Sequence, residues 1–281
     1  MRVFRTTFLL VALTLLLMLL GQIIVHGRTG MTIGLGFAIV SNAFAYFFSD
    51  KIALLSSGAK PVTREQLPRL YAVMERLAAK ANLPVPKLYV VPEAAPNAFA
   101  TGRNPRHASV AVTQGLLELM NDDELEGVIA HELSHVRNYD ILISSIAATI
   151  AGAITWIAYW GPYRDDREGG GGGGLLGLLM VILAPLAAML LQLALSRQRE
   201  YSADETGARM VGNPYGLISA LQKLGAYNQR LATTAISPST SALCIVKPLF
   251  RGGSLGTLFS THPPLAKRIA ALREMTIVPE R

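Results

Sequence analysis

The chain has 281 residues, of which 51% are hydrophobic and only 16% are charged, whereas charged residues make up about 25% of an average soluble protein. This composition excludes a disordered chain and argues against a freely soluble protein. The single cysteine, Cys244, excludes an intramolecular disulfide framework. The formal net charge of +7 suits either nucleic acid or an anionic membrane surface, and the positions of the charges decide between these partners.

Four segments without a charged residue account for the hydrophobic composition. Each is about 20 residues long, which is the length that an α-helix needs to cross a bilayer. They are residues 6–25, 31–49, 141–160 and 175–195. The first has no small-residue cleavage site after its apolar core, so it predicts an uncleaved helix instead of a signal peptide. The alternative is a set of buried core helices, but four charge-free stretches in one short chain favour two transmembrane hairpins.

The basic residues indicate how these hairpins are oriented. Lys and Arg flank the first segment at its start and the second and fourth at their ends, and residues 196–281 hold 11 basic and 5 acidic residues. Under the positive-inside rule, both termini and the two large polar segments are therefore cytoplasmic, and the Gly169–Gly174 loop lies across the membrane. Because the basic excess flanks the membrane segments and no nucleic-acid motif is present, we expect the lipid bilayer as a partner and no nucleic acid.

The two polar segments have the pattern of one folded domain. Thr63–Gln66 has the form of a capping box ahead of an amphipathic helix. Short strands are predicted at residues 87–91, 97–101 and 109–113, and another helix begins at Asn121. The sequence thus predicts a mainly α-helical membrane protein with a cytoplasmic α+β domain that the second hairpin divides. Its successive parts are residues 1–50, 51–140, 141–196 and 197–281.

The helix that begins at Asn121 contains the motif H-E-x-x-H, formed by His131, Glu132 and His135. Residues four positions apart in a helix are separated by about 400° of rotation, so both imidazoles lie on one face and can share a metal ion. Imidazole nitrogen is a usual zinc ligand. In zinc peptidases with this motif, the glutamate activates the attacking water. The alternative is a chance match with two solvated or core histidines.

A catalytic zinc ion needs a third protein ligand. Asp140 is five residues from His135 and lies off the ligand face, which indicates a supporting role at the end of the helix. Carboxylates between the third and fourth predicted spans are excluded because that loop lies across the membrane. Glu200, Asp204 and Glu205 all follow the return to the cytoplasmic side. Glu200 and Asp204 share one helix face, so one can bind the metal while the other orients a histidine.

The chain resembles the HtpX family of bacterial membrane zinc metallopeptidases, which is related to the CaaX prenyl proteases. The resemblance covers nearly the whole chain and includes the two amino-terminal spans and the second hairpin. Its sequence motifs are N-A-F-A-T-G at Asn97–Gly102, H-E-L-S-H-V-R-N-Y-D at His131–Asp140, S-R-Q-R-E-Y-S-A-D-E-T-G-A at Ser196–Ala208 and T-H-P-P-L-A-K-R-I-A-A-L at Thr261–Leu272. It implies a zincin-like domain with one zinc ion per chain in the inner (cytoplasmic) membrane of a bacterium.

The resemblance implies that His131, His135 and Glu200 bind zinc, that Glu132 is the general base and that Asp204 supports a ligand. These roles are consistent with the spacing of the residues, although the spacing alone leaves the third ligand open. Hydrolysis of peptide bonds follows from them, with polypeptides or membrane proteins as substrates. A role in the quality control of misfolded proteins is implied by the family.

Further binding residues rest mainly on the resemblance. Asn97 and Ala98 belong to a segment that, in similar peptidases, forms an edge strand and pairs with the substrate backbone. An ordinary hairpin is the alternative. His262 and Arg268 resemble a pair near the metal that stabilises the oxyanion, although a helix cap explains His262 as well. Tyr201 stands where a small or polar residue is expected, and its role stays open.

Two other classes of protein are weighed against the endopeptidase. A non-proteolytic membrane scaffold or chaperone with a structural metal site would normally use four protein ligands rich in cysteine, whereas this chain has only Cys244. A transporter would need ionisable residues inside its spans, and the four predicted spans have none. Nothing in the sequence indicates an oligomeric state.

Overall fold

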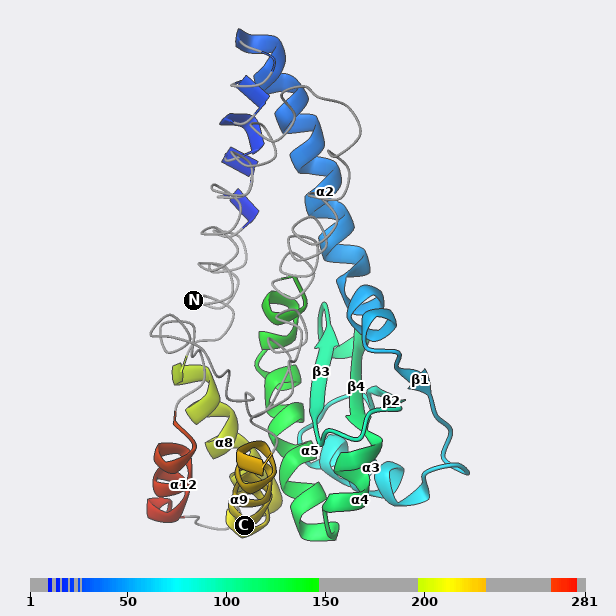
Figure 1. The fold of residues 1–281 in the computed structure, drawn as a ribbon, viewed down its shortest axis with the longest axis vertical. Helices are drawn as coiled ribbons and strands as arrows, with labels where there is room; N and C mark the ends of the chain where they lie inside the picture. Colours follow the sequence, from blue (N-terminus) through cyan, green and yellow to red (C-terminus); the bar gives the residue numbers. More distant parts are fainter. Residues whose placement is uncertain are drawn as a thin grey trace.

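The computed structural model describes residues 27–146, 197–230 and 264–276, together with isolated positions between residues 10 and 25. Half of the first predicted span, the third beyond residue 146, the whole fourth span, the Gly169–Gly174 loop and His262 lie outside these residues. Figure 1 shows a long helix, α2, that extends from one end of the molecule to a small sheet surrounded by shorter helices.

Helix α2 (Gly27–Ser56) has 30 residues and is the one helix in the described part of the chain that is long and apolar enough to cross a membrane. It extends beyond the predicted span at both ends. Its last turns bury Ala53 and Leu54, and Leu54 packs against Val91, Phe99 and Ala111 of the sheet. The helix therefore joins the apolar segment directly to the folded domain.

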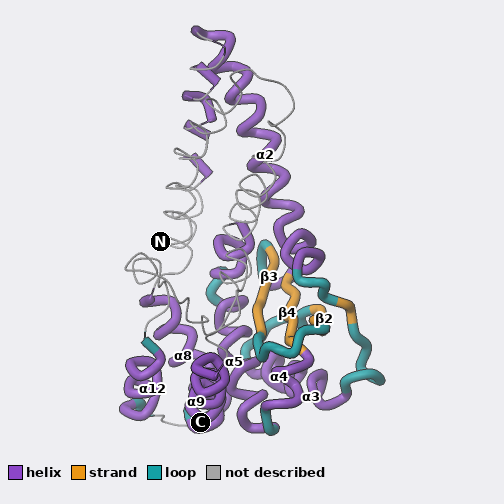
Figure 2. The backbone as a smooth tube through the Cα atoms, in the orientation of Figure 1, coloured by secondary structure: helices purple, strands orange, loops and turns teal. Residues whose placement is uncertain are grey.

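The sheet has four strands, and the three predicted ones are present with shifts of at most one residue. The strands are β1 (Lys60–Pro61), β2 (Lys87–Val91), β3 (Ala98–Gly102) and β4 (Ala108–Thr113). Their order is β1-β2-β4-β3. β2 and β4 are parallel, while the β1–β2 and β3–β4 pairs are antiparallel. This order leaves β3 at an edge of the sheet, as Figure 2 also shows.

The helices of the domain enclose a single main core. They are α3 (Pro68–Lys80), α4 (Gln114–Leu119), α5 (Asp122–Arg137), α8 (Arg197–Val211), α9 (Tyr215–Arg230) and α12 (Leu265–Glu274). Helix α5 lies at the centre, since it packs against α3, α8, α9 and β3. The core joins Ala98, Val110 and Val112 of the sheet to Leu70 of α3 and Leu133 of α5. The two polar parts of the sequence thus fold together.

Candidate active site

Helix α5 carries H-E-x-x-H, and its start is fixed by a capping box. The Asn121 side chain accepts a hydrogen bond from the Glu124 backbone N–H, and Glu124 accepts one from the Asn121 N–H, both at 2.9 Å. The buried Glu124 carboxylate also accepts bonds from Ser219 Oγ at 2.6 Å and Lys223 Nζ at 2.7 Å on α9. The same group therefore caps α5 and attaches it to α9.

Three side chains converge at the middle of α5 and form a candidate metal site. His131 Nε2 lies 3.3 Å from His135 Nε2; Glu200 Oε2 lies 3.7 Å from His131 Nε2, and Glu200 Oε1 lies 3.7 Å from His135 Nε2. Two ligands about 2.1 Å from a tetrahedral zinc ion lie about 3.4 Å apart, so these spacings fit one ion. Two histidines and one carboxylate are also a donor set of catalytic zinc sites. The structure thus brings together the three residues predicted as ligands.

Glu200 reaches the histidines because α8 lies close against α5. A Cβ atom added at Gly207 would lie 3.0 Å from the backbone nitrogen of His131, which is tighter than ordinary van der Waals contact. Any larger residue at Gly207 would therefore push α8 away from α5. Glu205, on the same helix as Glu200, forms an exposed ion pair with Arg209 at 2.9 Å and does not belong to the cluster.

Each histidine contacts a second carboxylate through its other ring nitrogen. Asp204 Oδ1 lies 2.9 Å from His131 Nδ1, and Asp140 Oδ2 lies 3.4 Å from His135 Nδ1. A carboxylate at Nδ1 favours the tautomer that carries its proton there and leaves Nε2 free to bind a metal. The structure therefore places Asp204 and Asp140 where supporting residues are expected.

Arg268 is 1% exposed and contacts the carboxylates behind the site. Its Nε donates to Asp204 Oδ2 at 2.8 Å, and its Nη2 donates to Asp204 Oδ1 at 2.6 Å. Its Nη1 lies 3.6 Å from Glu200 Oε2. Burial alone would raise the pKa of Asp204, but the charge and hydrogen bonds of Arg268, together with the contact with His131, outweigh burial and lower it. The sequence pointed to an oxyanion role for Arg268 and missed this bidentate ion pair.

The protein groups of the site carry an excess of negative charge. Burial alone would lower the pKa of His135, but the hydrogen bond with Asp140 and the charges of Glu200 and Glu132 outweigh burial and raise it to about 9. Burial raises the pKa of Glu132, although both neighbouring histidines act in the opposite direction. The buried carboxylates therefore stabilise positive charge at the histidines. A divalent metal ion bound there would supply that charge.

Glu132 faces the edge strand β3. Its carboxylate interacts with the backbone amide of Ala100, which counteracts part of the effect of burial on its pKa. The next residue but one, Gly102, donates its amide to Ser145 Oγ at 3.3 Å. Asn97 instead pairs with β4, because its carbonyl accepts from the Thr113 N–H at 2.9 Å. In an antiparallel strand, the backbone N–H and C=O groups of successive residues point alternately toward and away from the neighbouring strand. Because Asn97 pairs with β4, the backbone groups of Ala98 and Ala100 point away from β4.

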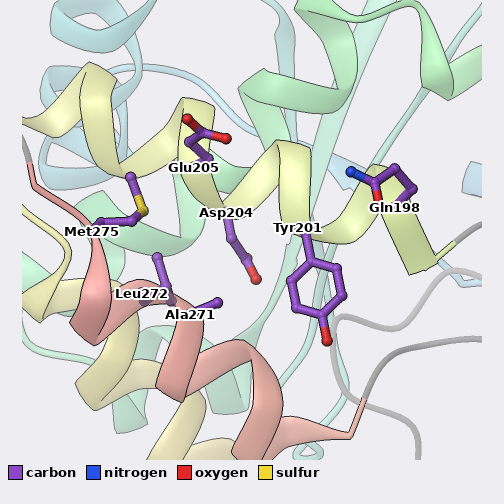
Figure 3. Close-up of a pocket in the computed structure, with 7 residues that line it drawn as sticks. All are labelled: Gln198, Tyr201, Asp204, Glu205, Ala271, Leu272 and Met275. Atoms are coloured by element: carbon purple, nitrogen blue, oxygen red, sulfur yellow. The ribbon is translucent and has the colours of Figure 1, made fainter.

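A cavity of about 340 Å³ lies behind Asp204, between α8 and α12. Figure 3 shows Asp204 and Tyr201 extending from α8 toward α12. The residues around the cavity are Gln198, Tyr201, Asp204, Glu205, Ala271, Leu272 and Met275. Tyr201, whose role the sequence leaves open, therefore lines the space beside Asp204 and is not one of the clustered metal-binding residues.

Known proteins have similar sequences over most of this chain. Residues 64–276 match the model of Peptidase family M48. The protease HtpX homolog of Desulfatibacillum aliphaticivorans is 52% identical over 95% of this chain and 88% of its own length. The protease HtpX homolog of Pyrococcus furiosus is 48% identical over 97% of this chain and 96% of its own.

A solved structure has a similar fold. The crystal structure of S. mikatae Ste24p matches 92% of this chain with a TM-score of 0.50 and 18% identity. This chain spans 62% of the length of that protein, and at this identity the likeness concerns the fold alone. The agreement of the family match with the relatives along almost the entire chain settles the family. The chain belongs to peptidase family M48, among the HtpX proteases, and is a membrane-bound metalloprotease that acts on polypeptides.

Proposed function

We propose that this protein is a zinc-dependent endopeptidase in which His131, His135 and Glu200 bind one zinc ion and Glu132 is the general base. The observation that supports this proposal best is the convergence of the three ligand side chains within 4.8 Å of one another. The carboxylates behind both histidines add to it, because they prepare each Nε2 for a metal. Zinc is the metal that this donor set favours.

Zinc at this site supplies Lewis acidity to the scissile carbonyl and to the attacking water. Glu132 takes a proton from that water and delivers it to the leaving amine. Burial raises the pKa of Glu132, which helps a carboxylate to accept a proton near neutral pH. Asp204 and Asp140 hold the imidazoles in one orientation while Glu132 moves the proton. His262 is proposed as an oxyanion donor on the basis of the family motif.

The substrate is proposed to bind as an added strand beside β3. An edge strand has backbone groups without a partner strand, and an extended peptide can pair with them. Ala98 is the proposed pairing residue, since its backbone groups point away from β4 and the Asn97 carbonyl is already paired with Thr113; Ala98 itself is buried, so a peptide must reach it from the active-site side. Asn97 would contribute through its side chain. A peptide bound at Ala98 lies two residues along the strand from Ala100, whose backbone amide interacts with Glu132.

The proposed topology has two transmembrane hairpins, in residues 1–50 and 141–196. The catalytic domain comprises residues 51–140 and 197–281 and lies on the cytoplasmic side of the bacterial inner membrane, with both termini. This orientation follows from the distribution of Lys and Arg. It puts the site beside the bilayer, so membrane proteins and misfolded polypeptides are the proposed substrates. Membership of a protease family argues against the alternative of a non-proteolytic scaffold.

Replacement of the third ligand tests the metal site. We expect Glu200→Ala to lose bound zinc and to abolish cleavage of casein, because two histidines alone hold zinc weakly. Glu205→Ala is the matched control, since Glu205 lies on the same helix but pairs with Arg209 in solvent; it should keep both zinc and activity. Full zinc content in Glu200→Ala, measured on the purified protein, would show that another residue is the third ligand.

A further inference from the structure

The turn between β3 and β4 projects beside α2, toward the end of the molecule that holds the apolar helix (Figures 1 and 2). We call residues 103–107 the hairpin tip. Its first residue, Arg103, has its guanidinium carbon 5.5 Å from the ring centre of Phe47 on α2. Asn104 accepts a hydrogen bond from the His107 backbone N–H at 3.1 Å and contacts His107 Nδ1 at 2.9 Å. The tip is thus a defined turn held against the helix.

The part of α2 beside the hairpin tip has the composition of a membrane interface. Residues 29–49 of the helix contain no charge, and large apolar side chains are exposed along it, including Phe44, Phe47 and Phe48. Asp50 and Lys51 then introduce the first charges. Aromatic rings followed by charged residues mark the level at which a spanning helix leaves the hydrocarbon core. The tip contacts α2 at that level.

Positive charge collects at the same level. Lys51 Nζ lies 5.3 Å from the ring centre of Phe48, Arg103 lies over Phe47, and Arg106 is exposed at the end of the tip. Within the described part of the chain, none of these three side chains forms an ion pair with a carboxylate. The neighbouring Asp50 accepts from the Lys51 backbone N–H at 2.8 Å and does not neutralise Arg103 or Arg106.

We propose that the hairpin tip, together with Lys51, binds anionic lipid headgroups at the bilayer surface. Guanidinium groups pair with phosphate through two parallel hydrogen bonds, and each basic residue at an anionic surface strengthens the association by roughly five-fold. The contact holds the Gly102 end of the edge strand at the membrane, while the neighbouring Ala100 faces Glu132. The lipid surface would thereby fix the distance between the peptide-binding strand β3 and the bilayer.

The local lipid composition at the tip tests this proposal without reference to hydrolysis. His107→Cys, in a chain that also carries Cys244→Ser and Glu132→Gln, is labelled with a fluorophore and placed in nanodiscs of phosphatidylglycerol and phosphatidylcholine. Spin labels are attached to one lipid or the other, and the quenching of the fluorophore is compared. We expect stronger quenching by labelled phosphatidylglycerol than its share of the lipid predicts. Adding Arg103→Gln and Arg106→Gln should return the ratio to that share.

Two control pairs separate charge at the tip from net charge and from folding. Lys80→Gln with Lys267→Gln removes the same charge from exposed positions on α3 and α12, at the far end of the domain (Figure 1), and should keep the enrichment. Arg103→Lys with Arg106→Lys should keep most of it. Equal quenching by both lipids in the parent protein, or the same enrichment after both arginines become glutamine, would overturn the proposal. Absence of quenching by either lipid would place the tip away from the bilayer and overturn it as well.

Discussion

At the scale of single residues, the candidate metal site is the end of a series of buried charge contacts. Arg268 holds Asp204 with two hydrogen bonds, and Asp204 in turn lies 2.9 Å from His131 Nδ1. H-E-x-x-H predicts His131 and His135 from local helix geometry, while the i,i+4 relation of Glu200 and Asp204 leaves open which of them binds the metal and the family resemblance implies Glu200. The pairing of Arg268 with Asp204 was not predictable, because it joins residues 64 positions apart and depends on how α12 packs on α8.

Replacement of Arg268 tests whether this series orients the site. Arg268→Gln leaves the Asp204 carboxylate buried without its cation, which we expect to cost about 3–5 kcal/mol of stability. The pKa of Asp204 should rise, because Arg268, through its charge and its hydrogen bonds, contributes most of what lowers it. A weaker hold on His131 should reduce zinc affinity by roughly 10–100-fold. Thermal unfolding and competitive zinc titration of the purified protein measure the two effects.

A double variant separates positioning from stability. Arg268→Gln combined with Asp204→Asn removes the uncompensated charge, so stability should recover in part while zinc affinity stays low. Arg268→Lys should give intermediate affinity, because an ammonium group cannot form the paired hydrogen bonds of a guanidinium. The positioning role is wrong if Arg268→Gln binds zinc as tightly as the natural protein.

At the scale of elements, patterns in the sequence predicted the strands and the start of α5, but not the start of α3. Alternating apolar runs between Pro and Gly predicted β2 as found and β3 and β4 to within one residue. The capping box at Thr63–Gln66 predicted an earlier start for α3 than Pro68. There Gln66 does accept from the Thr63 N–H at 2.9 Å, but Pro68 forces Leu67 out of helical geometry and delays the helix. The contact of α2 with the sheet depends on tertiary packing that no local pattern encodes.

The contribution of Glu124, which attaches α5 to α9, to the stability of the fold should depend on pH. Burial alone would raise the pKa of Glu124, but its bonds with Lys223, Ser219 and Asn121 outweigh burial and lower it. Its ionised form therefore stabilises the fold above the ordinary carboxyl pKa of 4.5, and this contribution disappears as the pH falls below that value through the folded-state pKa. We expect Glu124→Gln to cost about 1–3 kcal/mol at pH 7.

The comparison of melting temperatures over a range of pH checks this expectation. The difference between the natural protein and Glu124→Gln should shrink progressively below pH 4.5. Glu118→Gln is a suitable control, because Glu118 is exposed on α4 and should behave as the natural protein does. A difference that stays constant at all pH values would mean that the ionised carboxylate is not what joins α5 to α9.

At the scale of the whole molecule, the low content of charged residues reflects a division into parts. The four predicted spans contain none of the charges, and the described domain around α5 has the charge pairs and compact core of an ordinary enzyme. The proposed topology has a direct consequence for the loop between the third and fourth spans. A reporter inserted at Gly169–Gly174 should be active outside the cytoplasm, whereas a carboxyl-terminal fusion should report the cytoplasm. A cytoplasmic signal at the glycine loop would contradict the two-hairpin topology.

The measurement that tests the account most directly compares the natural protein with Glu132→Gln. Both are purified in detergent, and zinc content and casein cleavage are measured on the same preparations. Because Glu132 is proposed to move protons and not to bind the metal, the variant should keep one zinc ion per chain and lose cleavage, by about 100-fold or more. Cleavage at the natural rate by a zinc-loaded Glu132→Gln protein would contradict the central claim that Glu132 is the general base.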